Sequence, residues 1–160
     1  MYAKTRKLMT LVAVVLTFCL CPLARTASAQ SPNSNCKQVK GSLAVNFGPG
    51  VANGTITNGG FLNGTIATTF NAGVVPTADP AAVSFTGSST ITTNGGTIVT
   101  HEVYVFDFVR SLTSALLRID SATSTGAFAG ATGVIFLNSS SASLESGQGE
   151  LAGQICFATE

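Results

Sequence analysis

The residues best suited to acid–base chemistry gather in one segment, 97–110 (TIVTHEVYVFDFVR). His101 is the only histidine of the chain, so a Ser-His-acid triad would have to use it, with Asp107 or Glu102 as the orienting carboxylate. In an extended strand Asp107 lies about 20 Å from His101, at roughly 3.3 Å per residue, and Glu102 points to the opposite face. No G-x-S-x-G elbow is present. We therefore expect His101 to be a surface or strand-edge residue.

A second group in the same segment is better placed to form a pocket. Glu102, Tyr104, Phe106 and Phe108 share one face by alternation, and Arg118 could join them from the next strand. Burial among aromatic rings disfavours the charged form of a carboxylate, so such a group can act as an acid or a base. We take Glu102, Tyr104, Phe106 and Arg118 as the candidate ligand site. The alternative is a solvated Glu102 at the strand end and an ordinary surface ion pair for Arg118.

Metal and cofactor sites find little support in the residue types. There is no histidine pair and no cysteine cluster, and DSATSTG (120–126) lacks the carboxylates of a calcium loop. We expect neither a metal nor a cofactor. N-x-S/T sequons occur at Asn53, Asn63 and Asn138 and would be used only in a eukaryotic secretory pathway.

The N-terminus has the layout of a secretory signal peptide. Three basic residues (Lys4, Arg6, Lys7) precede the apolar run 8–20, and Ala27-Ser28-Ala29 forms a small-x-small cleavage site before Gln30. The alternative, a membrane anchor, needs about 20 apolar residues. We expect residues 1–29 to be removed and residues 30–160 to form one domain, secreted or periplasmic, without a membrane span.

The net charge and the cysteines further limit the classes of function that the chain can have. Residues 30–160 hold four basic and seven acidic residues, a net charge of −3, which argues against nucleic acid because that binding depends on Lys and Arg. Cys36 and Cys156 remain after processing, one near each end of the domain. In an exported protein such a pair is expected to form one disulfide. The alternative, a reactive or metal-binding pair, lacks neighbouring ligands.

The remaining chain reads as short strands separated by Gly and Asn turns. Leu43, Val45 and Phe47 alternate within 41–48. Segment 97–110 is apolar on both faces, which predicts a central strand covered on both sides. A turn at 111–114 and a strand at 115–120 should follow, with a helix as the alternative. Together these segments predict an all-β, antiparallel, eight-stranded barrel, with a β-sandwich as the alternative.

The stretch TGAFAGATG (125–133) places Gly126, Gly130 and Gly133 around Phe128. Its G-x3-G-x2-G spacing and the β-type VIFLN that follows fit neither a dinucleotide loop nor a P-loop, which needs Lys and Ser/Thr after its last glycine. Glycine permits positive φ and close backbone approach. We therefore expect a structural turn in which Phe128 plugs one end of the barrel.

The same stretch resembles the GTGRFAGATG-type signature of the allene oxide cyclase and dirigent-like barrel superfamily. STITTNGGTIVT before it resembles the middle hairpin of that barrel, and GELAGQIC after it resembles the closing strand. The resemblance implies an eight-stranded antiparallel barrel whose interior holds apolar small molecules. Some members cyclise fatty-acid epoxides and others guide phenoxy-radical coupling, but their catalytic residues have no matching motif here.

Residues and resemblance together favour an exported binding or structural module for an apolar small molecule. The alternatives are an isomerase of the allene oxide cyclase type, with Glu102 and Tyr104 in the barrel, and a surface adhesion or assembly subunit.

Overall fold

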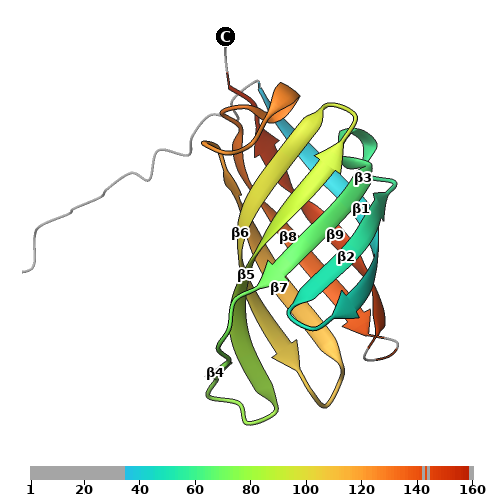
Figure 1. Cartoon of the computed structure of the whole chain (residues 1–160), viewed down its shortest axis with the longest axis vertical. Coiled ribbons are helices and arrows are strands. Elements are labelled where there is room, and N and C mark those ends of the chain that lie inside the picture. Colours follow the sequence, from blue (N-terminus) through green and yellow to red (C-terminus); the bar gives the residue numbers. More distant parts are fainter. Residues whose placement is uncertain (1–34, 142, 144, 159–160) are drawn as a thin grey trace, which may run out of the picture. The chain divides into compact units, whose positions relative to one another are not determined.

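The computed structural model describes residues 35–141, 143 and 145–158, which form a closed antiparallel barrel (Figure 1). The expected signal peptide, 1–29, lies outside the described residues. The barrel strands are β1 (Cys36–Gly48), β2 (Val51–Thr57), β3 (Gly64–Phe70), β5 (Ala82–Thr93), β6 (Gly96–Asp107), β7 (Leu112–Asp120), β8 (Thr132–Ser141) and β9 (Ser146–Cys156). A two-residue strand, β4 (Val75–Pro76), pairs with β5 outside the ring.

The sheet closes on itself through the pairing of β3 with β5. Neighbouring strands follow the order β3-β2-β1-β9-β8-β7-β6-β5, and β3 then pairs with β5 from Gly64↔Thr93 to Phe70↔Gly87. Closure satisfies the backbone groups that an open edge would leave unpaired. The predicted eight-stranded barrel is confirmed, and the sandwich alternative is wrong.

Alternation along the strands fills much of the barrel with apolar side chains. In β1, for example, Val39, Leu43 and Val45 are buried. Ala44 and Asn46, which alternate with them, face outward. Ile56, Ile91, Ile98 and Ile155, all close to the disulfide end of their strands, are at most 1% exposed. Side chains of the described residues therefore fill the barrel at that end, and a cup opens at the other.

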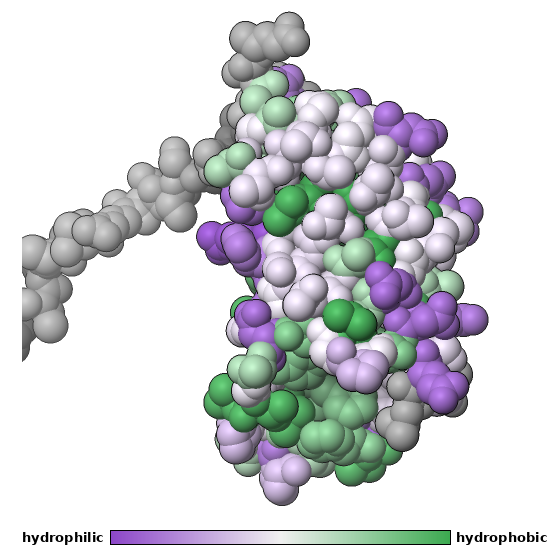
Figure 2. Space-filling model, viewed as in Figure 1, coloured by the Kyte–Doolittle hydropathy of each residue, from purple (hydrophilic) through white to green (hydrophobic). Residues whose placement is uncertain are grey.

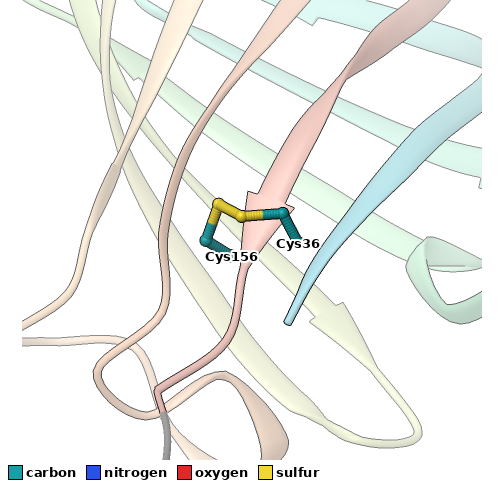
Figure 3. The surroundings of a disulfide bond; sticks show 2 residues. All are labelled: Cys36 and Cys156. Carbon is teal, nitrogen blue, oxygen red and sulfur yellow. A yellow bond between two sulfur atoms is a disulfide. The ribbon is translucent and has the colours of Figure 1, made fainter. Parts of the chain in front are cut away.

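Cys36 and Cys156 form a disulfide between directly paired positions of β1 and β9 (Figure 3). They lie 120 residues apart in the sequence, so the bond links both ends of the domain. This confirms the predicted pairing. The ring of Phe157, next to the bond, packs against those of Phe61 and Phe128 with centroids 5.6 and 5.9 Å away.

The glycine stretch forms the connection from β7 to β8 at the disulfide end. Its centre is a single 3-10 turn, η2 (Gly126–Phe128), in which Gly126 has φ +64°. A Cβ on Gly126 would lie 2.3 Å from the carbonyl oxygen of Gly95, and the N–H of Ala127 donates to that oxygen at 2.8 Å. The turn therefore packs against the β5–β6 hairpin, and the Phe128 side chain is buried beneath the turn.

Two expectations for the segments around β6 are wrong. The outer face of β6 is not covered, because a single closed sheet has no second layer over its wall, and Val103 and Val105 are 52% and 43% exposed. The turn expected at 111–114 is wrong, because β7 pairs with β6 from Leu112 onward, three residues before the expected start of the strand. The strand expected at 115–120 is confirmed, and its helix alternative is wrong. In the described part of the chain no helix is long and apolar enough to cross a membrane.

Candidate functional site

A cup of about 530 Å³ opens at the end of the barrel opposite the disulfide. Four phenylalanines contributed by β1, β3, β5 and β6 form most of its apolar wall, because alternation turns each of them inward near the same end. These are Phe47, Phe70, Phe85 and Phe106. Small polar side chains complete the rim, namely Asn71, Ser111, Thr113, Ser141 and Ser143. The cup can therefore take an apolar body and hydrogen-bond a polar group at its edge.

The cup continues inward to a chamber of about 60 Å³. Phe47, Phe70, Phe85 and Thr113 line both spaces, and Tyr104 lies at the chamber wall. The volume suits a small substituent of a molecule seated in the cup.

Three rings hold the chamber wall in place. The rings of Phe85 and Tyr104 are stacked, with centroids 5.0 Å apart and an interplanar angle of 5°. Phe70 meets both rings edge-on, at 5.5 Å from Phe85 and 5.4 Å from Tyr104. Offset and edge-to-face pairs of this kind stabilise aromatic clusters beyond their buried area. The Tyr104 ring is thereby kept in a defined orientation.

Beneath this cluster lies a buried polar network centred on Glu102, which is 3% exposed. The Thr100 hydroxyl donates to Glu102 Oε1 at 2.8 Å, and the Tyr104 hydroxyl donates to Oε2. Thr68 and Ser89 hydroxyls form a further hydrogen bond of 2.6 Å. Among the described residues no buried side-chain polar atom lacks a partner, so the network meets the requirement that buried polar groups be satisfied.

The phenol of Tyr104 is held in its protonated form. Burial, followed by the charge of Glu102 and the hydrogen bond to it, raises the pKa of Tyr104 well above its ordinary value, while the hydroxyls of Thr68 and Ser89 lower it in part. Tyr104 is therefore a hydrogen-bond donor here and no source of phenolate.

The structure brings three of the four predicted ligand-site residues to the interior and separates the fourth. Phe106 lines the cup and Tyr104 lines the chamber, whereas Glu102 lies two residues farther from the mouth along β6. Arg118 does not join them: it is exposed on the outer face, opposite His101 in the β6–β7 register. Its neighbours Leu117 and Ile119 take the inward positions of β7.

His101 also lies on the outer wall, as expected. Its side chain is 71% exposed, and its Nε2 lies 3.5 Å from Asp120 Oδ2. The Thr123 hydroxyl, then the Ala122 N–H, and more weakly the charge of His101, lower the pKa of Asp120. Asp107, the carboxylate considered as a triad member, is paired with Arg110 instead.

The sequon asparagines are exposed on the outside of the barrel. Oδ1 of Asn63 accepts from the Gly59 N–H at 2.7 Å, and Oδ1 of Asn138 accepts from the Ser114 hydroxyl at 2.8 Å. Near Asn138, a shallow hollow of about 680 Å³ runs over β7, β8, β9 and β1 and is lined largely by Ser, Thr, Asn and Gln side chains.

Two features of the site went unassigned in the sequence. Phe47 belongs to the alternating pattern of 41–48, and Phe70 and Phe85 also face inward, but their convergence at one end depends on strand register. Thr100 completes the Glu102 network and was omitted from the inward face of its strand.

Within the described ranges, no group of three or more His, Cys, Asp and Glu side chains is arranged to hold a metal ion.

The chain matches no protein-family model, and neither curated proteins nor solved structures give a significant match. A proposal of function therefore rests on the geometry of the site.

Proposed function

We propose that the protein binds an apolar small molecule in the aromatic cup. The observation that carries this proposal is the convergence of four phenylalanine rings from four strands around a hollow of about 530 Å³. Small-molecule sites typically measure about 300–1,000 Å³ and combine apolar walls with a few polar groups. The resemblance of residues 125–133 to a superfamily with apolar barrel interiors supports the same proposal.

The shape and chemistry of the cup define the class of ligand. Four rings favour a flat or ring-containing body, since aromatic faces stack on one another. Hydroxyl and amide groups at the rim suit one hydroxyl or carbonyl of the ligand, and none of the described residues that line the cup is charged. We therefore propose a neutral, largely apolar ligand.

The Cys36–Cys156 disulfide supports a place of action outside the cytoplasm, because such bonds persist in oxidising compartments. With the signal-like residues 1–29, this leads us to propose a secreted or periplasmic binding protein.

A titration with the neutral fluorescent probe N-phenyl-1-naphthylamine tests the proposal. We expect saturable binding that Phe106→Ser weakens by about tenfold, the effect of removing one well-packed aromatic contact. Phe136→Ser is the matched control, because Phe136 is a 52% exposed phenylalanine on the outer wall. Equal loss in both variants, or no saturable binding by the original chain, would refute the cup as the site.

A second candidate function is isomerisation or cyclisation of the bound molecule, favoured by one observation: Tyr104, protonated and backed by Glu102, lines the chamber below the cup. A ligand group in the chamber would lie against the Tyr104 ring, and the hydroxyl could donate to that group only by giving up its hydrogen bond to Glu102. Tyr104→Phe separates the two functions, since it should leave probe binding in the cup intact and abolish any turnover of a bound substrate.

A further inference from the structure

The open end of the barrel carries a group of exposed apolar side chains in addition to the cup. They come from two segments, the connection from β3 to β5 that includes β4, and the connection from β6 to β7 with the first residue of β7. They are Val74 (61% exposed), Val75 (60%), Phe108 (55%), Val109 (76%) and Leu112 (44%). Figure 2 shows apolar residues gathered at this lower end of the view, below a more polar wall. Exposed apolar groups of this kind mark interaction surfaces.

The backbone fixes these side chains in their outward positions. The N–H of Phe108 donates to the Ala81 carbonyl at 2.9 Å, which joins the two segments. Within the turn, Asp107 Oδ1 accepts from the N–H groups of Val109 and Arg110, both at 2.9 Å. The tip bearing Phe108 and Val109 is therefore a built turn whose apolar side chains face solvent.

Arg110 is the one basic side chain at this tip among the described residues, and the carboxylates of Asp107 and Asp79 both act on it. Arg110 Nη1 lies 2.8 Å from Asp107 Oδ2. The other basic side chains of the described residues, Lys37, Lys40 and Arg118, belong to the part of β1 and β7 nearer the disulfide. The described residues thus place no unpaired basic side chain at this end, so apolar contact, and not attraction of anionic groups, would hold a partner here.

The exposed group is continuous with the cup. Val74 belongs to both, because it is 61% exposed and also lines the cup. Phe106 lines the cup, and its ring meets that of Phe108 edge-on at 5.1 Å. Any apolar phase that takes up Phe108 and Val109 would thus lie directly against the mouth of the ligand site.

We propose that this end of the barrel docks on a lipid surface, with Phe108 and Val109 inserted among the lipid chains at the interface and the cup opening toward the bilayer. Projecting apolar tips fit a deformable hydrocarbon phase, whereas a protein partner would have to supply matching pockets for each. The purpose assigned to the docking, delivery or uptake of an apolar ligand, rests on the proposed function; the docking itself rests on the exposed tips.

Flotation with phosphatidylcholine vesicles tests the docking, using the exported protein after its N-terminus has been determined. The double variant Phe108→Ser/Val109→Ser should reduce the bound fraction by at least about tenfold, because burial of one such side chain alone is worth about that factor. The control Phe136→Ser replaces a phenylalanine of similar exposure on the wall. It should bind vesicles as the original chain does, and raised salt should leave binding unchanged.

Several results would overturn the docking proposal. These are failure of the original protein to float, equal binding by the double variant, or an equal loss in Phe136→Ser. A self-associated original protein that the double variant turns into a monomer, without vesicle binding, would assign the end to a second copy of the chain. Probe titration in the absence of vesicles tests ligand binding in the cup independently of lipid docking. The double variant should retain probe affinity, and vesicle binding without probe binding would refute the ligand site alone.

Discussion

The hydroxyl of Tyr104 donates a hydrogen bond to Oε2 of Glu102 inside the barrel. The phenol is thus turned away from the cup, and the Tyr104 ring contributes its apolar surface to the chamber. Glu102 receives its second hydrogen bond from Thr100. A polar cluster in the barrel interior is in this way satisfied internally, and the chamber is lined mainly by apolar side chains together with Thr68, Thr113 and Ser139.

Tyr104→Phe should lower the free energy of unfolding by about 1–3 kcal/mol, because it leaves a buried carboxylate oxygen without its donor. Urea unfolding at neutral pH measures the loss. The double variant Glu102→Leu/Tyr104→Phe removes both partners and should regain part of the lost stability. A single variant as stable as the original chain would show that the hydrogen bond contributes nothing net.

Stability should fall at alkaline pH in a way that depends on Tyr104. Its pKa is raised in the folded state above the ordinary value of about 10, so its contribution is fully present below that pH and is lost as the pH rises from there toward the folded-state pKa. Tyr104 is the only tyrosine of residues 30–160, and the chain has no tryptophan. Tyrosinate absorbance of residues 30–160 should therefore appear only with unfolding, and ordinary titration of the folded protein would contradict the buried hydrogen bond.

Gly126→Ala should destabilise the fold more than Gly60→Ala does. The two glycines have nearly equal φ, +64° and +61°. A Cβ at Gly126 would meet the Gly95 carbonyl oxygen at 2.3 Å, while one at Gly60 would meet nothing within 4 Å. Gly60→Ala should cost roughly 1 kcal/mol of backbone strain and Gly126→Ala clearly more. Equal losses in thermal unfolding would mean that the β7–β8 turn does not need its close approach to the β5–β6 hairpin.

Reduction of the Cys36–Cys156 disulfide should lower the free energy of unfolding by roughly 2–5 kcal/mol, because the bond restricts the unfolded chain over nearly the whole domain. Cys36→Ser/Cys156→Ser should have the same effect and should make stability insensitive to reductant. Thiol titration of the unfolded, unreduced protein should find no free thiol from this pair. Two free thiols there would refute the bond.

Much of the fold follows from local patterns. Alternation in 41–48 and 97–110, turns rich in Gly and Asn, and a cysteine near each end predict a disulfide-linked β-barrel. The prediction that Arg118 joins the ligand site was wrong. Leu117 and Ile119 face inward, so alternation already places the residue between them on the outside. The strand predicted at 115–120 was correct, and the turn predicted at 111–114 was wrong because pairing with β6 extends the strand to Leu112.

The cup could not be predicted in the same way. Phe47, Phe70 and Phe85 each alternate inward on their own strands, but only the stagger of the hairpins around the ring brings them to one end. The apolar outer face of β6 misled for the opposite reason. Alternation shows that Val103 and Val105 share a face, and only the closed single sheet leaves that face exposed.

Chemical-shift mapping by NMR tests the central claim most directly. N-phenyl-1-naphthylamine is titrated into isotope-labelled protein comprising residues 30–160. Binding in the cup predicts the largest shifts at Thr113, Phe85 and Phe106, because aromatic rings perturb the nuclei that they contact. Val103 and Phe136 on the outer wall should not move. Shifts confined to the outer wall, or none at saturation of the probe, would contradict a ligand site in the barrel mouth.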